Sequence, residues 1–394
     1  MNPQFSAIPL EQPTVTARSR RAVAIGLPRG IDPSERRFPL TPEGVAMLTE
    51  RGYTIKLEQG AGAPIHYTDM QYSRAGAMIV NRSEALKCDM VMHLAPLSAA
   101  DISQMRRGAV LFTLFNLCRL PSDSVRQLLQ RGITTIAVDL VKDTAGNNPF
   151  ADILAEIDGR AAISRAASLL ADAVHGKGIL LGGIAGIVPC EVTVIGSGIA
   201  ACATARSAIG AGAVVRMFDH DLYSLRNATR ELGPGVIGSS MHPRSLAAAL
   251  TTADVVVYTG TSPALSVDAD TVSTMKRGVI VFDLTNDCGN AFASLPVVDL
   301  ATASPIDISP VKPTRVCYVN AGSSVPRTAA MALSNSFITL LTQIAGCEGM
   351  ANALKLLPGL RDATLTYVGK TVHRDIAEKH GERYVDINIF ITLS

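Results

Sequence analysis

The sequence has almost no net charge, because its 36 basic residues nearly balance its 34 acidic ones. Nucleic acids and anionic membrane surfaces attract proteins that carry basic stripes, and the sequence has none. Long apolar runs are also missing, since none approaches the ~20 residues that a membrane-spanning helix needs. We therefore expect neither a nucleic-acid partner nor a membrane partner.

Paired cysteine motifs are absent as well. The seven cysteines form no Cys-x-x-Cys pair and no Cys/His spacing typical of a metal site. They are scattered through apolar segments, which is typical of reduced thiols in a cytoplasmic protein. Residues 1–20 lack the apolar stretch of a secretory signal, and we expect a disordered extension there. The sequence predicts a cytoplasmic protein without a metal site.

Short β-rich runs alternate with helical stretches in the first third of the chain. Arg21–Leu27 is typical of a strand, and the segment that follows Thr41 is typical of a helix. In that helix Thr41 is the expected N-cap, Pro42 occupies the first position and Gly52 follows the end. Strands and helices that alternate in this way predict a parallel α/β sheet.

Two long helical segments bracket a second α/β series. The first covers about Ile153–Val174 and the second Thr328–Ala345. The chain would leave a first domain, build a second and return, and its 394 residues are enough for two domains. The predicted fold is α/β with two Rossmann-like domains joined by these two helices. Residues 153–327 would form an inserted domain, and residues 21–152 together with 328–394 a discontinuous one.

A dinucleotide-binding motif opens the inserted domain. A β-branched strand, Val192–Ile195, leads into a glycine-rich turn, a helix of small residues and a second strand. The two glycines permit a tight turn and let a pyrophosphate approach the N–H groups at the start of the helix. An acidic residue about 20 residues later accepts from the ribose hydroxyls and repels a 2′-phosphate, which favours NAD (NADH) over NADP. The predicted cofactor-binding residues here are Gly196, Ser197, Gly198, Ile199 and Asp219.

With this motif placed, the sequence resembles the alanine dehydrogenase and transhydrogenase α-subunit family from about Ala22 to Tyr384. The resemblance is carried by "GLPRGIDPSERRFPLTPEGVAML", by the linker "GKGILLGGIAGIVPCEVTVIGSG" and by "CYVNAGSSVPRTAAMALSN". It implies an NAD-dependent oxidoreductase whose discontinuous domain binds the substrate. It also implies a homo-oligomer, a dimer or larger, joined through the connecting helices.

The resemblance assigns roles to three single residues. Arg37 stands where the family's arginine binds a substrate carboxylate, and a guanidinium fork suits a planar carboxylate in any case. Asp287 stands where the family has an aspartate beside the nicotinamide and the substrate. Asn320 stands at a nicotinamide-contacting asparagine. We therefore expect a small-molecule substrate that bears a carboxylate.

The sequence departs from the family at its catalytic positions. One strand of the alanine dehydrogenases ends in Lys-x-Lys-Glu-Pro, and the second lysine is catalytic. Here His93 and Ala95 replace the two lysines. Asn116 replaces the family's catalytic histidine, and Ala155 replaces a serine that precedes the connecting helix. Asn116 can donate a hydrogen bond but cannot transfer a proton.

His93 has two interpretations. A lone histidine in an apolar strand is usually a packed, hydrogen-bonded core residue. Residues two apart on a strand share a face, however, so His93 would point the same way as position 95 and could enter the cleft. The predicted catalytic residues are Arg37, His93, Asn116 and Asp287.

The two missing ionisable groups argue against ordinary alanine dehydrogenation. Making alanine from pyruvate and ammonia needs repeated proton transfer, whereas a preformed iminium is already positive at nitrogen and needs far less help. We expect an NAD-dependent enzyme that reduces a preformed imine or imino acid, or runs the reverse amine oxidation. Three alternatives remain: a catalytically silent NAD(H)-binding protein, a 2-oxo or 2-hydroxy acid reductase that uses His93, and a transhydrogenase NAD(H) subunit.

Overall fold

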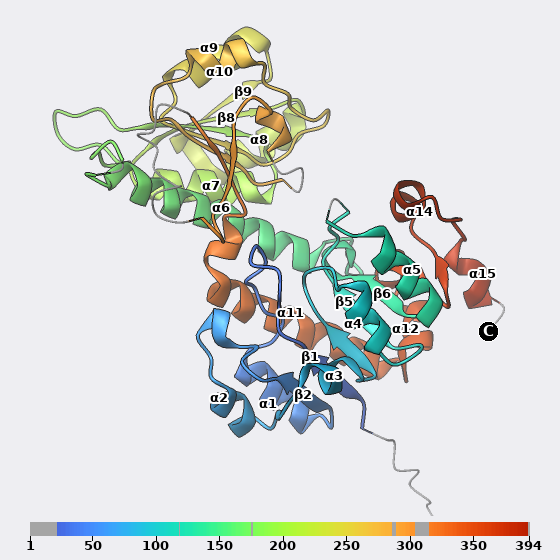
Figure 1. Ribbon diagram of the computed structural model, residues 1–394. Coiled ribbons are helices and arrows are strands. Elements are labelled where there is room, and N and C mark those ends of the chain that lie inside the picture. Colours follow the sequence, from blue (N-terminus) through green and yellow to red (C-terminus); the bar gives the residue numbers. More distant parts are fainter. Residues whose placement is uncertain (1–21, 118, 175, 286–288, 304–314, 393–394) are drawn as a thin grey trace, which may run out of the picture.

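The computed structural model describes residues 22–117, 119–174, 176–285, 289–303 and 315–392. The predicted N-terminal extension, residues 1–20, lies outside this part of the chain. Figure 1 shows two α/β bodies with a long helix passing between them.

The first body is built on an eight-stranded sheet in the order β15-β14-β6-β5-β4-β1-β2-β3. Strands β1 to β6 are all parallel, and β14 and β15 extend the sheet antiparallel at one edge. The strands are β1 (Ala24–Leu27), β2 (Thr54–Glu58), β3 (Met78–Val80), β4 (Met90–Met92), β5 (Val110–Thr113), β6 (Thr134–Ala137), β14 (Thr364–Tyr367) and β15 (Lys370–Thr371).

Helices alternate with these strands, as the sequence predicted. Thr41 caps the first helix by accepting from the backbone N–H of Gly44, and Gly52 has a φ of +88° just beyond its end. The helices and 3-10 turns are α1 (Pro42–Glu50), η1 (Ala63–Ile65), α2 (Asp69–Arg74), α3 (Arg82–Leu86), α4 (Ala99–Gln104), α5 (Ser122–Arg131), η2 (Val138–Leu140), α12 (Met350–Leu356), α13 (Pro358–Asp362), α14 (Arg374–His380) and α15 (Ile387–Thr392).

The second body is a seven-stranded parallel sheet in the order β12-β13-β11-β10-β7-β8-β9. The chain builds outward from β7 to β9 and then returns to β10 on the other side of β7, which is the doubly wound order of a Rossmann fold. Its elements are β7 (Glu191–Ile195), α7 (Ile199–Gly210), β8 (Val214–Asp219), α8 (Leu222–Leu232), η3 (Gly233–Gly235), β9 (Val236–Ser240), α9 (Pro243–Thr252), β10 (Val255–Tyr258), α10 (Ala269–Thr274), β11 (Ile280–Asp283), η4 (Asn290–Phe292), β12 (Val297–Asp299), β13 (Cys317–Val319) and η5 (Gly322–Ser324).

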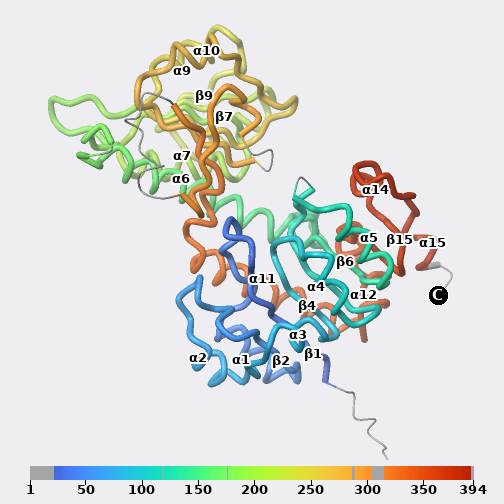
Figure 2. The backbone as a smooth tube through the Cα atoms, in the orientation of Figure 1, coloured from blue at the N-terminus to red at the C-terminus, as the bar shows by residue number. Residues whose placement is uncertain are grey.

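Two long helices, α6 (Pro149–Ala171) and α11 (Pro326–Gly346), connect the bodies, as predicted (Figure 2). Helix α6 belongs to both cores: Phe150 is buried in the core of the first body, and Leu170 in that of the second. No single residue therefore separates the domains, and the boundaries at residues 152 and 328 stay predictions.

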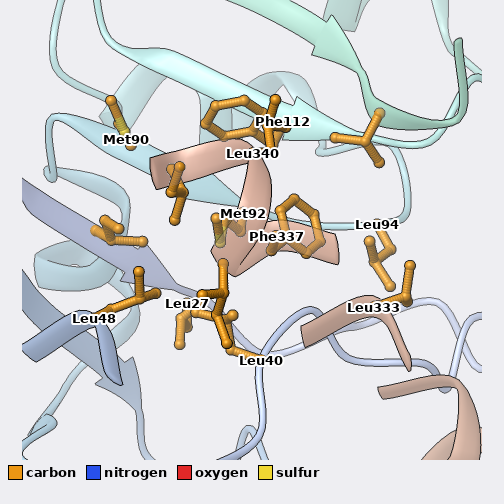
Figure 3. Close-up of a cluster of buried hydrophobic side chains, with 14 of the residues drawn as sticks. Leu27, Leu40, Leu48, Met90, Met92, Leu94, Phe112, Leu333, Phe337 and Leu340 are labelled. Carbon is orange, nitrogen blue, oxygen red and sulfur yellow. The ribbon is translucent and has the colours of Figure 1, made fainter. Parts of the chain in front are cut away.

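Helix α11 has 21 residues and is apolar enough, by length and composition, to cross a membrane. Half of its most apolar window is buried inside the protein. The ring of Phe337 packs against Phe112 and Phe150, with centroids 6.3 and 4.9 Å apart. Figure 3 shows Leu333 and Leu340 beside it, facing the strands of the first sheet. The apolar character of α11 is that of a helix in a protein core.

The glycine inside α6 permits a close helix contact. A Cβ on Gly159 would lie 2.4 Å from the carbonyl oxygen of Ala200 and 2.9 Å from the backbone nitrogen of Thr204, both on α7. A glycine in a helix costs about 1 kcal/mol relative to alanine. Here that cost is offset by contact between α6 and the first turns of α7.

This contact predicts that replacing glycine with alanine affects stability differently at Gly159 and at Gly210. Gly159→Ala forces a Cβ against backbone atoms, and such overpacking costs about 1–3 kcal/mol. Gly210→Ala is the matched control, because a Cβ there meets nothing within 4 Å. Thermal unfolding should therefore show a lower Tm for Gly159→Ala and an unchanged or higher Tm for Gly210→Ala. Equal Tm values for the two variants would mean that α6 and α7 are not in contact at Gly159.

Candidate active site between the domains

A cavity of about 220 Å³ lies between the two bodies. From the first body it is lined by segments that follow β1, β4, β5 and β6, and from the second by residues that follow β7, β10 and β11. Ligands of open α/β sheets bind at these carboxyl ends of the strands. A neighbouring cavity of about 100 Å³ shares much of this lining and adds Thr285 and Asn320. The charged and polar residues of the larger cavity are Asp32, Glu35, Arg37, Asn116, Arg119, Asp139, Asp158 and Thr259.

Arg37 lines both cavities, as its predicted role requires. Its Nε donates to Oε1 of Glu35 at 2.8 Å and its Nη2 to Oε2 at 2.5 Å. Burial alone lowers the pKa of Arg37, but the carboxylates of Glu35, Asp158 and Asp139 outweigh it and hold the pKa above its ordinary value. The guanidinium therefore stays charged, and among the described residues its Nη1 has no hydrogen-bond partner.

Asn116 also lines both cavities, just beyond the end of β5. Its Oδ1 accepts from the backbone N–H of Arg119 at 3.1 Å. This bond uses the acceptor side of the amide and leaves Nδ2 as the group that can donate to a substrate.

The structure does not bring His93 to the cavity. Strand β4 ends at Met92, so the two-residue alternation that would align His93 with Ala95 does not extend that far. His93 is only 5% exposed, and its Nδ1 lies 2.6 Å from the carbonyl oxygen of Ala95. Burial lowers the pKa of His93, which favours the neutral ring. Its Nε2 is buried without a hydrogen-bond partner among the described residues, whereas Ala95 itself lines the cavity.

Two acidic residues that the sequence did not single out are part of this site. Asp158 projects from α6 and lines both cavities, and its Oδ1 accepts from the backbone N–H of Gly322 at 2.6 Å. Burial raises the pKa of Asp158 to about 6, although the charge of Arg37 opposes the shift. Asp139 follows β6 and accepts from the backbone N–H of Phe115 at 2.7 Å, and burial raises its pKa as well. No local sequence pattern distinguishes Asp158 from Asp152 and Glu156 on the same helix.

The predicted dinucleotide turn fits a pyrophosphate. Gly196 has a φ of +117°, and a Cβ there would lie 2.2 Å from Oγ1 of Thr259. Gly198 is the N-cap of α7, where no side chain caps the helix, and a Cβ on it would meet nothing within 4 Å. No side chain therefore competes for the first N–H groups of α7, and uncapped N–H groups at a helix start can bind a phosphate group. Ile199 is half-exposed beside the same turn.

Asp219 lies at the end of β8 next to this turn. Its Oδ2 accepts from the hydroxyl of Ser197 at 2.6 Å, and its Oδ1 accepts from the backbone N–H of Asp221 at 3.0 Å. Each carboxylate oxygen can accept a further hydrogen bond, so these contacts leave capacity for ribose hydroxyls. Asp219 and Ser197 both remain predicted cofactor residues.

Asn320 follows β13 with a φ of +63° and lines the smaller cavity. Its Nδ2 donates to the carbonyl oxygen of Ser34 at 2.5 Å and to Oδ1 of Asp299 at 3.1 Å. The bond to Ser34 joins the second body to the first. A nicotinamide contact by Asn320 stays a prediction. Asp287 lies outside the described residues.

Comparisons with known proteins agree with this geometry. The family models for the alanine dehydrogenase/PNT N-terminal and C-terminal domains match residues 26–157 and 162–374. The alanine dehydrogenase of Mycolicibacterium smegmatis is 30% identical over 375 residues, which are 93% of this chain and 99% of that protein.

Two solved structures share the fold. A structure titled L-alanine dehydrogenase superposes with a TM-score of 0.78 at 26% identity, covering 91% of this chain and 99% of its own. The transhydrogenase from Sinorhizobium meliloti superposes with a TM-score of 0.71 at 22% identity, covering 89% and 99%. The resemblance drawn from the sequence and the predicted cofactor are confirmed. The chain belongs to the alanine dehydrogenase/PNT family of NAD-dependent oxidoreductases.

Proposed function

We propose that the protein reduces a preformed C=N bond next to a carboxylate, or oxidises the corresponding amine. One observation carries this proposal. The cavity retains Arg37 but has Ala95 and Asn116 where the family resemblance places a catalytic lysine and histidine. The site can therefore hold a carboxylate, but neither of those two positions can move the protons needed to build an imine from a ketone and ammonia.

The substrate would lie between the two bodies. The Nη1 group of Arg37 binds the carboxylate, and Asn116 donates a hydrogen bond to a polar group of the substrate. NAD held at the glycine turn would supply hydride transfer at the carboxyl ends of the second sheet, where Thr259 and Leu284 line the cavity after β10 and β11. Holding the reacting carbon at that point is the main contribution of the protein.

The charge of the cavity favours a substrate nitrogen over a ketone oxygen. The larger cavity is lined by four carboxylates and two guanidinium groups. A 2-oxo acid would bring another negative charge, whereas an iminium or ammonium group would balance part of the excess. A reductase that uses His93 is less well supported, because His93 does not line the cavity.

The test follows NADH absorbance with the purified protein. Cyclic imino acids or bulkier imino acids should oxidise NADH, and pyruvate with ammonium should not. Arg37→Lys should raise KM for the carboxylate substrate roughly ten- to hundredfold, because a charge-assisted hydrogen bond contributes about 1.5–3 kcal/mol. The matched cyclic imine without a carboxylate is the control, and its KM should change little.

Two results would contradict the proposal. Efficient alanine formation from pyruvate and ammonium would mean that the missing lysine and histidine have been replaced functionally. Bound NADH with no turnover of any imine would favour a catalytically silent NAD(H)-binding protein.

We also propose a homo-oligomer in the cytoplasm, with α6 and the segment after it as the interface. That segment exposes apolar side chains, with Leu180 66% and Val188 85% exposed, together with Ile184 and Ile187. The described cysteines, which are Cys88, Cys190, Cys202, Cys317 and Cys347, are free thiols, which fits a reducing compartment. Light scattering should give a molar mass of two or more chains. The mass of a single chain would contradict the oligomer.

A further inference from the structure

We propose that Asp158 is the proton donor and acceptor of this cavity. In the direction of reduction it protonates the imine nitrogen, and in the direction of oxidation it takes that proton back. This inference rests on the proposed function and adds the residue that moves the proton.

Helix α6 places Asp158 in the cavity wall. Ala151, Leu154, Ala155 and Asp158 all line the larger cavity, and their spacing of three and four residues puts them on one face of the helix. Asp158 also lines the smaller cavity and contacts Gly322 of the second body. It therefore lies where the substrate pocket of the first body meets the nucleotide domain.

The other carboxylates of the cavity have different partners or positions. Glu35 accepts from Nε and Nη2 of Arg37. Asp32 pairs with Arg119 at 3.4 Å. Asp139 lines only the larger of the two cavities, on the side of the first body. Within the described residues, Asp158 is the one of these four acids that hydrogen-bonds to the second body, at the backbone N–H of Gly322, so it lies where the two bodies meet.

Close packing holds the Asp158 carboxyl in place. A Cβ on Gly322 would lie 2.2 Å from its Oδ1, so only a glycine allows the backbone N–H to reach it. That bond uses one carboxyl oxygen and leaves the other for a substrate nitrogen. A proton-transferring group needs this kind of fixed position within hydrogen-bond reach of the reacting atom.

The surroundings of Asp158 set its protonation. The other charged groups that line its cavity are Asp32, Glu35 and Arg37 from the segment after β1, Arg119 after β5 and Asp139 after β6. The described residues of the second body that line the two cavities are all uncharged. Burial raises the pKa of Asp158 to about 6. Both the protonated and the ionised form are therefore accessible near neutral pH, as general acid–base catalysis requires.

The step balances in atoms and electrons. Asp158 protonates the neutral imine, so an iminium forms beside an ionised carboxylate, and the hydride that NADH would supply forms a C–H bond at its carbon while the C=N π pair moves to nitrogen. The proton of Asp158 forms the N–H bond, which leaves an amine, NAD⁺ and an ionised carboxylate. Solvent returns the proton to Asp158 before the next turnover.

The test compares Asp158→Asn with the wild type on an imine that the wild type reduces. Asparagine keeps an oxygen that can accept from Gly322 but has no proton to transfer. We expect kcat/KM to fall ~10²- to 10⁴-fold, and the limb of the pH profile near pH 6 to disappear, while NADH affinity is retained. Glu156→Gln on the same helix is the control, because Glu156 pairs with Arg160 at the surface and lines neither cavity.

A second readout does not need turnover. The pKa of Asp158 is higher in the folded protein, at about 6, than in the unfolded chain, at about 3.9. The folded protein therefore binds the proton more tightly, and the stability that this gives is present below about pH 4 and is lost as pH rises through about pH 6. Asparagine does not titrate. The Tm of Asp158→Asn should therefore rise relative to that of the wild type between these pH values.

The outcomes separate this inference from the function on which it rests. If the wild type reduces no imine, the proposed function fails and the role of Asp158 fails with it. If the wild type is active and Asp158→Asn keeps both the rate and the pH limb, only the role of Asp158 is overturned. A Tm difference that does not vary with pH would also overturn it, because Asp158 would not titrate in this range.

Discussion

The packing of one helix, α6, determines the site. The helix buries Phe150 in the first core and Leu170 in the second, and it contacts α7 closely at Gly159. Because a helix is a stiff rod that rises 1.5 Å per residue, these contacts limit how far the two bodies can separate. The cavity lies beside this helix, where the carboxyl ends of both sets of strands meet. The residue next to Gly159 is Asp158, so the contact that joins the bodies also positions an acid in the cavity.

Charge then restricts what the cavity can bind. Burying a carboxylate is costly unless it is paired, hydrogen-bonded or protonated. Glu35 is paired with Arg37, while Asp139 and Asp158 accept from backbone N–H groups and have raised pKa values. A substrate that carries both a carboxylate and a positive nitrogen complements Arg37 on one side and these acids on the other. An imino acid or an amino acid has this pattern of charges, and a simple 2-oxo acid does not.

Much of the fold could be predicted from the sequence, because it depends on local patterns. The alternation of strands and helices, the glycine turn at Gly196 and the helix near residues 153–174 are each encoded in short stretches. The positions of Arg37 and Asn116 in the cavity followed from the family resemblance. The place of His93 outside the cavity lining could not be predicted, because an apolar run does not show that β4 ends at Met92.

Asp158 could not have been assigned to the cavity from the sequence alone. Its place in the cavity depends on which face of α6 meets the second body, and that face is set by contacts with Ala200 and Gly322, which are distant in the sequence. The raised pKa of Asp158 is likewise a result of tertiary burial. Local patterns therefore indicated the cofactor site, whereas the acids of the substrate site depend on how the two bodies pack.

The most direct measurement follows the hydride itself. NADH that carries deuterium at the transferring position of the nicotinamide is incubated with the protein and an imino acid, and the product is examined by mass spectrometry and NMR. Reduction of a preformed C=N bond predicts one deuterium on the carbon that bears nitrogen in the product amine. It also predicts no deuterated alanine when pyruvate and ammonium replace the imino acid. Deuterated alanine from that mixture, or an amine product without deuterium, would contradict it.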